Sequence, residues 1–245
     1  MLRVDALRVA YGRLAALRGV SIAVAQGEIV CIVGPNGAGK SSLLNAIAGG
    51  VVPEAGTISF EGENLVGMRP ERVARLGLSL VPEGRHVFST LTVAENLRLG
   101  TFMRRPSAAV EQRFAQIMAY FPRLRERQSS PAGGLSGGEQ QMLVIGRALM
   151  TAPRLVMVDE PSLGLAPKII DQVYEILLDL RRTNGLTLLI NEQSSQRVLK
   201  CADRIYVLRN GAIQLEDLAS NLQDGEAIMH AYFGFREVAP AGAQT

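Results

Sequence analysis

A glycine-rich run from Gly34 to Ser41 has the residue types and the spacing that bind phosphate. It reads Gly-Pro-Asn-Gly-Ala-Gly-Lys-Ser, which fits the P-loop pattern G-x-x-x-x-G-K-S/T. Gly37 and Gly39 lack Cβ atoms, so the backbone can curl into a concavity whose N–H groups point inward. The Lys40 ammonium adds positive charge for the β- and γ-phosphates, and the Ser41 hydroxyl suits Mg²⁺. The run therefore predicts a nucleoside triphosphate site.

Two carboxylates end an apolar stretch further along the chain. Asp159 and Glu160 follow Leu155-Val156-Met157-Val158, which has the character of a buried strand. Ligands collect at the carboxyl ends of strands in open α/β sheets, where the P-loop also lies. We therefore expect Asp159 to orient Mg²⁺ or its water, and Glu160 to polarise the attacking water as a general base. The alternative is that these carboxylates merely end a strand, which the upstream P-loop argues against.

A third stretch, Leu135 to Gln141, carries two glycines between a serine and a glutamate. Ser136 and Glu139 form the Ser-x-x-Glu pattern of a capping box, which starts a helix through reciprocal hydrogen bonds. The same helix N-terminus, with Gly137 and Gly138 in its first turn, also suits an anion. Both interpretations hold together, so the stretch predicts a capped helix whose N-terminus meets a phosphate.

The elements that must position these residues alternate between strands and helices. The P-loop joins a buried strand to a helix, whose positive N-terminus then faces the phosphates. This alternation implies a mostly parallel sheet, and the two strands before the P-loop are typical of a small antiparallel sheet. Asn210-Gly211 predicts the turn of a final hairpin. The expected strands span 2–9, 20–24, 28–33, 57–60, 78–81, 155–158, 186–190 and 205–208, and the expected helices span 42–49, 70–76, 92–99, 108–121, 137–150, 168–182, 194–199 and 224–233.

We expect a single α/β domain over residues 1–245. Residues 1–90 and 151–235 are expected to form a P-loop nucleotide-binding core with an N-terminal antiparallel β part. Between residues 91 and 150 helical spacing replaces strands, which predicts an inserted helical subdomain ending in the helix after Ser136. Residues 236–245 are small and polar and are expected to form a flexible tail.

Composition and charge limit the classes of function. Hydrophobic residues make up 47% of the 245, which supports a sizeable core, and no apolar run reaches the roughly 20 residues that span a bilayer. Membrane association is therefore expected only through a partner. The net charge of +3 comes without a dense basic stripe, so no nucleic-acid partner is expected. Cys31 and Cys201 are expected to be reduced core thiols, and His86 and His230 are too few for a histidine metal site.

With these three stretches in this order, the chain resembles an ABC transporter ATP-binding subunit over essentially its whole length. Leu-Ser-Gly-Gly-Glu-Gln-Gln from 135 to 141 is similar to the LSGGQ signature of that family. The resemblance implies an ABC-type core that uses ATP and Mg²⁺, in which two subunits close head to tail around two ATP molecules. Each signature would then meet the γ-phosphate bound by the other subunit's P-loop. It also implies that Tyr11 stacks on adenine, an ordinary strand-end aromatic being the alternative.

The same resemblance implies a role for each site residue. Lys40 and Glu160 are the expected catalytic residues, and Ser41, Glu83 and Asp159 are the expected metal ligands. The residues expected to act in trans are Ser136, Gly137, Gly138 and Glu139, and the expected ATP-binding set is Tyr11, Gly34, Pro35, Asn36, Gly37, Ala38, Gly39, Lys40, Ser41, Ser42, Glu83 and Gln193.

Three positions depart from the general pattern of the family. Glu83 stands where the family keeps a glutamine that touches Mg²⁺, and its added negative charge is expected to be offset by Arg85. Gln193 stands where the family keeps a histidine, and its amide can hydrogen-bond a phosphate oxygen but carries no charge. Ala166 replaces an aspartate. These changes leave the base and the metal ligands in place, so we expect a functional but modest ATPase.

Four stretches narrow the resemblance to the shorter of the two ATPases of high-affinity branched-chain amino acid importers. They are residues 81–97, 159–167, 192–193 and 231–234. The implied partners are a second, different ATPase, two membrane permeases and, indirectly, a periplasmic binding protein, at the cytoplasmic face of the inner membrane. The alternatives are a homodimer in isolation, another cargo such as urea, amides or aromatic acids, a soluble ABC ATPase, and a non-hydrolysing regulator. The intact P-loop and carboxylates argue against the regulator.

Overall fold

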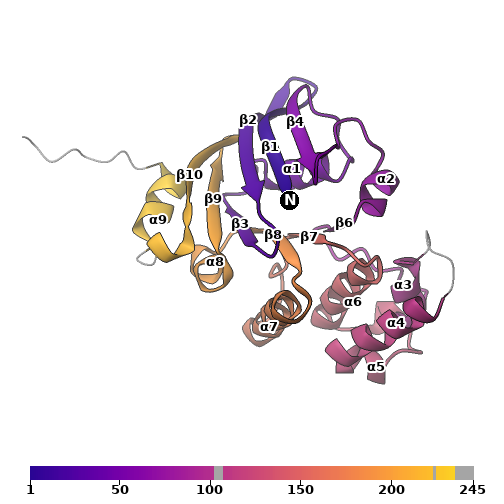
Figure 1. The fold of residues 1–245 in the computed structure, drawn as a ribbon. Helices are drawn as coiled ribbons and strands as arrows, with labels where there is room; N and C mark the ends of the chain where they lie inside the picture. The colour runs from indigo at the N-terminus through magenta and orange to yellow at the C-terminus, as the bar shows by residue number, and fades with distance from the viewer. Residues whose placement is uncertain (102–106, 223–224, 235–245) are drawn as a thin grey trace, which may run out of the picture.

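Two β-sheets organise the computed structural model, which describes residues 1–101, 107–222 and 225–234 (Figure 1). The first sheet is antiparallel and has the order β2-β1-β4-β5. Its strands are β1 (Leu2–Tyr11), β2 (Leu14–Val24), β4 (Ala55–Phe60) and β5 (Glu63–Asn64). Buried residues alternate with more exposed ones along most of β1, as a sheet with one covered face requires. The predicted antiparallel sheet at the N-terminus is thereby confirmed.

The second sheet has six strands in the order β10-β9-β3-β8-β7-β6. Its pairs are parallel except for the β9–β10 hairpin, which turns at Asn210-Gly211 as predicted. The strand before the P-loop, β3, lies between β8 and β9, and the strand that ends in Asp159, β7, pairs with β8. The sheet therefore brings the predicted strand ends to one edge. The strands are β3 (Ile29–Val33), β6 (Leu78–Val81), β7 (Leu155–Asp159), β8 (Thr187–Glu192), β9 (Arg204–Arg209) and β10 (Ala212–Leu218).

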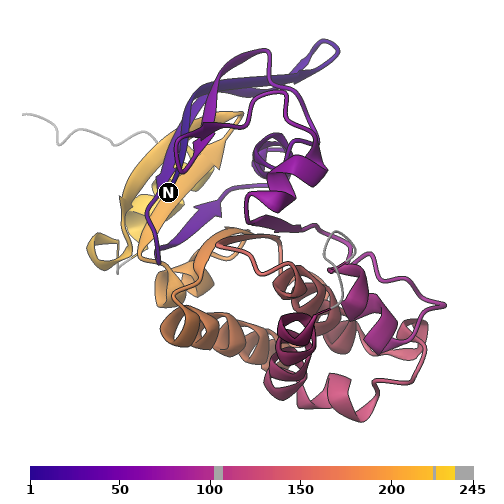
Figure 2. The ribbon, with the colours of Figure 1, turned by 45° about the vertical axis from the view of Figure 1, so that its right-hand side comes forward.

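Both faces of the six-stranded sheet are covered. On one face Val30 and Ile32 of β3 pack with the antiparallel sheet and with α1 (Lys40–Ile47). On the other face Cys31 and Val33 pack in a core with α6 (Gly137–Met150), α7 (Pro167–Asn184) and α8 (Ser195–Cys201). Figure 2 shows these two layers on opposite sides of the sheet. Because β3 is buried on both faces, its sequence is an unbroken apolar run.

A group of helices lies at one end of the molecule, beyond β6 and β7 (Figure 1). Met142, Ile145 and Leu149 of α6 are buried there, as their helical spacing predicted. The group comprises α3 (Val93–Leu99), α4 (Ala108–Tyr120), α5 (Pro122–Glu126) and α6, with a 3-10 turn at Ala132–Gly134. The remaining helices are α2 (Pro70–Arg75) and α9 (Glu226–Phe233), and a second 3-10 turn spans Ala219–Asn221.

Several elements differ from the sequence-based expectation. β2 begins at Leu14 instead of residue 20, because its first half pairs with the end of β1 across the turn at Gly12. α1 begins at Lys40 instead of residue 42, since Gly39 precedes it in the left-handed conformation. β5 and α5 were not expected. The expected tail at 236–245 and the expected helix start at 224 lie outside the described residues.

Both cysteines lie in the core, as expected of reduced thiols. Cys31 and Cys201 are free and buried, and Sγ of Cys201 donates to the carbonyl oxygen of Val198. The nearby Cys201 thiol, together with burial, raises the pKa of Cys31 well above its ordinary value. The thiol therefore stays protonated and inert as a nucleophile.

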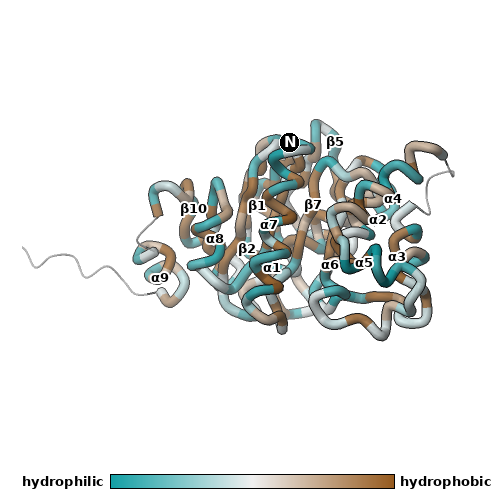
Figure 3. The backbone as a smooth tube through the Cα atoms, turned by 90° about the horizontal axis from the view of Figure 1, so that it is seen from below, coloured by the Kyte–Doolittle hydropathy of each residue, from teal (hydrophilic) through white to brown (hydrophobic). Residues whose placement is uncertain are grey.

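The longest described helix, α7, is amphipathic. Hydrophilic and hydrophobic residues alternate along it (Figure 3), and Val173, Leu177 and Leu180 are buried. None of the helices in the described part of the chain has the length and apolar character needed to cross a bilayer.

Candidate active site

The P-loop is held between β9 and β2, and two of its glycines are required by close backbone contacts. A Cβ atom on Gly34 would overlap the carbonyl oxygen of Leu208 in β9. A Cβ atom on Gly39 would lie 2.5 Å from the carbonyl oxygen of Ala16 in β2, and Gly39 also has a φ of 107°. Only glycine fits either position without a shift of the backbone. The loop is thereby fixed against two strands that lie far from it in sequence.

A cavity of about 400 Å³ opens in front of the P-loop. It brings together most of the residues that were predicted to bind ATP, including Tyr11, Glu83 and Gln193, with the predicted base Glu160. Gly34 and Pro35 lie behind it, and Asp159 is buried beside it at the end of β7. The lining residues are Tyr11, Leu14, Ala15, Ala16, Asn36, Gly37, Ala38, Gly39, Lys40, Ser41, Ser42, Glu83, Glu160, Leu163 and Gln193.

Lys40 lies at the centre of a buried set of acceptors. Its Nζ donates to the carbonyl oxygens of Gly34 at 2.7 Å and Pro35 at 3.2 Å. The same atom lies 3.2 Å from Oε1 of Glu160, and the two side chains are only 4% and 8% exposed. A charge pair so well removed from water is much less screened than a surface pair. The predicted phosphate ligand and the predicted base are thus direct neighbours.

Glu160 adopts a backbone conformation that its sequence context did not predict. Its φ of 48° lies in the left-handed region, which costs a residue with a side chain about 1–2 kcal/mol. Its N–H donates to the carbonyl oxygen of Asn191 at 3.0 Å, which secures the turn. The side chain then receives a 2.5 Å hydrogen bond at Oε2 from Nε2 of Gln193, which also donates to Asn36 at 2.8 Å. The strained turn therefore delivers the carboxylate to the cavity.

Asp159 is positioned by the neighbouring strand. Nδ2 of Asn191 in β8 donates to Oδ1 of Asp159 at 2.9 Å, and both residues are buried. The strand register places these residues opposite each other. Asn191 orients the predicted metal ligand, and it was not among the residues predicted for the site.

The signature stretch forms the predicted capping box at the start of α6. The N–H of Glu139 donates to Oγ of Ser136 at 3.3 Å, and the Glu139 carboxylate accepts from the N–H of Ser136 at 2.8 Å. Burial opposes ionisation of Glu139, but the hydrogen bonds that its carboxylate accepts from the hydroxyl and the N–H of Ser136, together with nearby Arg127, lower its pKa overall. Gly138 packs so closely on α7 that a Cβ atom would lie 2.5 Å from Cγ2 of Ile169. None of residues 136–139 lines the cavity of its own chain.

The loop after β6 carries Glu83 and Arg85. Glu83 is exposed and lines the cavity, but no ion pair joins it to Arg85 among the described residues. The Arg85 guanidinium instead points to the carbonyl oxygens of Leu163 at 3.5 Å and Gly164 at 3.3 Å. The backbone of Arg85 has a φ of 67°, which turns its side chain toward this loop. Arg85 therefore makes no direct ion pair with Glu83 among the described residues, and the expected offset of the Glu83 charge stays a prediction.

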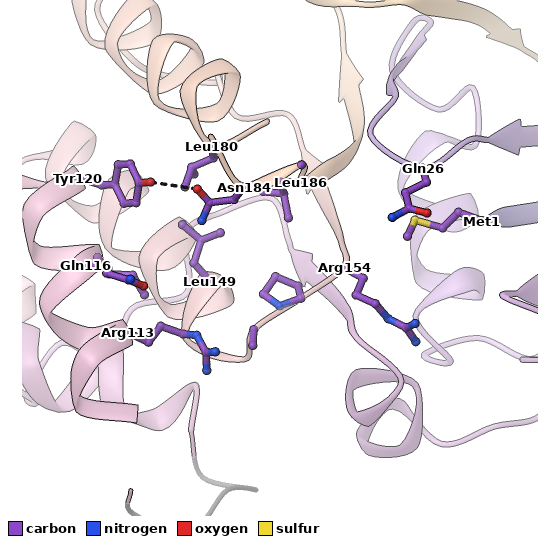
Figure 4. A pocket seen from close by; sticks show the side chains of 14 residues that line it. Met1, Gln26, Arg113, Gln116, Tyr120, Leu149, Arg154, Leu180, Asn184 and Leu186 are labelled. Atoms are coloured by element: carbon purple, nitrogen blue, oxygen red, sulfur yellow. Dashed lines mark hydrogen bonds between the residues drawn. The ribbon is translucent and has the colours of Figure 1, made fainter. Parts of the chain in front are cut away.

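A second cavity, of about 350 Å³, lies at the opposite end of the strands (Figure 4). Tyr120 of α4 spans part of its rim and donates to Oδ1 of Asn184 at 3.2 Å. Its lining includes Arg113 and Arg154 and none of the predicted site residues. The chemistry-bearing residues therefore gather in the cavity at the P-loop and not here.

Comparison with known proteins agrees with a nucleotide-binding site at the P-loop. A sequence profile described as ABC transporter matches residues 17–163. The chain is 47% identical to the high-affinity branched-chain amino acid transport ATP-binding protein BraG of Pseudomonas aeruginosa, over 96% of this chain and 100% of that protein. It is 30% identical to BraF of the same organism, which has the same description, over 96% and 98% of the two chains. The crystal structure of the ADP conformation of MJ1267, an ATP-binding cassette of an ABC transporter, is similar with a TM-score of 0.84 and 30% identity, over 96% of this chain and 99% of that chain.

Proposed function

The chain belongs to the ABC transporter family, and from this premise we propose that it is the ATPase subunit of an importer of branched-chain amino acids. ATP hydrolysis coupled to transport is the activity of the family. The observation that carries the proposal for this chain is the cavity that unites the P-loop, Glu160 and Gln193. The cargo rests on the printed descriptions of BraG and BraF.

ATP fits the cavity with its base toward β1 and its phosphates toward α1. Tyr11 is half exposed at the cavity and offers a ring face for adenine. The N–H groups of Asn36 to Ser42 and the N-terminus of α1 would hold the phosphates, with Lys40 on the terminal ones. Glu160 would accept the proton of the attacking water, and Gln193 would hold Glu160 in place through their hydrogen bond.

The residues beside the P-loop also fit Mg²⁺. A serine hydroxyl and two carboxylates, from Ser41, Glu83 and Asp159, are hard oxygen donors of the kind that this ion takes. Ser41 and Glu83 line one cavity, and Asp159 is fixed beside it by Asn191. Bound there, Mg²⁺ would neutralise charge on the β- and γ-phosphates.

A second ATPase subunit would complete the site. Ser136, Gly137, Gly138 and Glu139 lie outside the cavity of their own chain. Ser136 is exposed and Gly137 and Glu139 are half-buried, so this end of α6 would face the phosphates bound by another chain. We infer that this partner is a different chain of the BraF type, because Pseudomonas aeruginosa has two distinct ATP-binding proteins with the same transport description. A homodimer is the alternative for the isolated chain.

A groove beside the helical group is the proposed contact for the membrane permeases. It has a volume of about 610 Å³ and runs between β6 and α6, with Phe88 and Arg147 on its wall. The Arg147 guanidinium lies 5.4 Å from the Phe88 ring centre and donates to the carbonyl oxygen of His86 at 2.9 Å. Its Nη1 is buried without an acceptor among the described residues, and burial lowers the pKa of the group. Phe88 is half exposed in the groove, so a permease helix with an apolar face would cover its ring.

This arrangement assigns the parts of the chain to steps of transport. Residues 1–90 and 151–235 would bind and hydrolyse ATP, and the helical part from 91 to 150 would carry the signature toward the partner. Permease subunits in the groove would hold the chain at the cytoplasmic face of the membrane. A periplasmic binding protein would deliver the cargo on the other side.

Reconstitution tests the function and the cargo separately. The chain would be purified together with its partner ATPase and with the permeases and binding protein encoded by adjacent genes. The complex would then be reconstituted in membrane vesicles. We expect leucine, isoleucine or valine to stimulate ATP hydrolysis, and urea, amides and aromatic acids to have no effect. Stimulation by one of the latter would replace the cargo and leave the ATPase role intact. A chain that never associates with a permease would favour a soluble ABC ATPase and overturn the transporter assignment.

A further inference from the structure

We propose that Glu192 is a positioning residue that holds Gln193 against the base Glu160 and links it to the loop after β7. Glu192 is the last residue of β8 and directly precedes Gln193. Its side chain is only 2% exposed. No role in ATP binding or hydrolysis was predicted for it from the sequence. The inference rests on the proposed roles of Glu160 and Gln193.

Donors from several segments converge on the two carboxylate oxygens. Oε1 accepts a 2.7 Å hydrogen bond from the hydroxyl of Tyr174 in α7. Oε2 accepts from Oγ of Ser162 at 3.1 Å and from the backbone N–H of Gln193 at 3.1 Å. Nη1 of Arg197 in α8 lies 3.8 Å from the same oxygen. Both oxygens are occupied, so the carboxylate has one orientation.

Burial of this carboxylate is costly unless its hydrogen bonds compensate. A charged group removed from water needs well-placed donors, and hydrogen bonds to charged groups are stronger than those between neutral groups. Leu188 and Ile190, which share the face of β8 with Glu192, are apolar and buried in the core. The polar network at Glu192 is therefore not the pattern that fills the core elsewhere along this face.

The network ends at the base. Oε2 of Glu192 fixes the main chain of Gln193, and Nε2 of Gln193 then lies 2.5 Å from Oε2 of Glu160. On its other side the network reaches Ser162, which follows Glu160 by one proline in the sequence. A path through three hydrogen bonds thus joins both sides of the base.

The hydrogen bond from Ser162 to Glu192 also links the base to an exposed residue at the edge of the cavity. Leu163, the next residue, lines the cavity and is 48% exposed. A second subunit that presses on this loop would move Ser162, and Glu192 would pass the movement to Gln193. Through Glu192, the position of Gln193 would therefore depend on whether a second ATPase subunit contacts this loop.

Two hydroxyl deletions test this role with little change in volume. We expect Ser162→Ala and Tyr174→Phe each to lower kcat of ATP hydrolysis by about tenfold, as the loss of one hydrogen bond to a charged group implies. The KM for ATP should change less than about twofold, because the bonds do not touch the nucleotide. Ser220→Ala and Tyr232→Phe are matched controls away from Glu192 and should match the parent. Thermal unfolding of every variant shows whether the fold is retained.

A double-variant cycle separates positioning from a merely structural role. If Glu192 acts through Gln193, Ser162→Ala should have no further effect on kcat in a Gln193→Ala chain. If Ser162→Ala slows the Gln193→Ala chain by the same factor as the parent, the proposal is overturned. Unchanged kcat in both single variants would overturn it as well. A parent chain without ATPase activity in its complex would instead refute the proposed function, so the two failures are distinguishable.

Discussion

Nζ of Lys40 lies 3.2 Å from Oε1 of Glu160 in a buried ion pair. The cation that the site offers to phosphate is therefore already paired with the carboxylate that would activate water. A γ-phosphate competes for the same ammonium, and its arrival would release Glu160 toward the water that it must deprotonate.

Replacement of the base tests this assignment. Glu160→Gln should lower kcat by at least about 100-fold, because an amide cannot accept the proton of water. ATP binding should persist, since the P-loop is unchanged, and it can be measured by retention of labelled ATP. Glu63→Gln in exposed β5 removes one carboxylate far from the cavity and serves as the control. Unchanged steady-state hydrolysis by Glu160→Gln would show that another group is the base.

The contact between Gly34 and Leu208 predicts a large effect of one methyl group. A Cβ atom on Gly34 would overlap a backbone oxygen, which has no freedom to move aside. We expect Gly34→Ala to lower the free energy of unfolding by about 1–3 kcal/mol in urea titrations. Gly134→Ala is the matched control, because its nearest neighbour would be Nη2 of Arg127 at 4.0 Å. Equal stability of the two variants would mean that the close contact between Gly34 and Leu208 of β9 does not limit the side chain at position 34.

Two capping boxes of the same pattern allow an effect on stability to be distinguished from an effect on ATP hydrolysis. Thr92 caps α3 and Ser136 caps α6, each with a glutamate three residues later. Thr92→Ala and Ser136→Ala should each lower the free energy of unfolding by about 1 kcal/mol. Only Ser136→Ala should also slow hydrolysis by the assembled pair of ATPases, since Ser136 is proposed to meet ATP bound by the partner. A similar loss of hydrolysis in both variants would mean that Ser136 acts only as a helix cap and does not contact the ATP bound by the partner.

Tyr206 predicts how stability depends on alkaline pH. Burial, with the Glu216 carboxylate beside the hydroxyl, raises the pKa of Tyr206 to about 12 from an ordinary value of 10.0. The unfolded chain then releases the phenolic proton first, so the free energy of unfolding falls as the pH rises from about 10 to about 12. Tyr206→Phe should flatten this fall in denaturant titrations at several pH values. An equally steep fall in the variant would assign it to other groups.

The residues that could be predicted from sequence are those whose chemistry is local. The P-loop and the Ser136–Glu139 box depend on neighbours in the chain, and the Ser-x-x-Glu spacing is a local signal of a helix N-terminus. The left-handed backbone of Glu160 and the network of Glu192 depend instead on β8, α7 and α8. No spacing rule joins Glu192 to Tyr174 or Ser162. A charged residue at the end of an apolar strand was the one signal that pointed to it.

Arg85 illustrates the same limit from the opposite side. Its nearness to Glu83 in the sequence suggested that it offsets the charge of that residue, but its guanidinium donates to the carbonyl oxygens of Leu163 and Gly164. The sequence shows that a charged residue is near another, but it does not show which way its side chain points. Where a backbone turn decides which way a long side chain points, only the folded chain reveals its partner.

The place of β3 in the sheet has a consequence for how the protein is made. β3 (Ile29–Val33) is synthesised long before both strands that flank it, β8 (Thr187–Glu192) and β9 (Arg204–Arg209). Loops of this length must close before the P-loop gains its fixed surroundings, which makes such a sheet slow to assemble. A nascent chain that lacks β8 and β9 therefore has the phosphate-binding sequence without the frame that shapes it. ATP can act as a ligand for folding only once β8 and β9 have been synthesised.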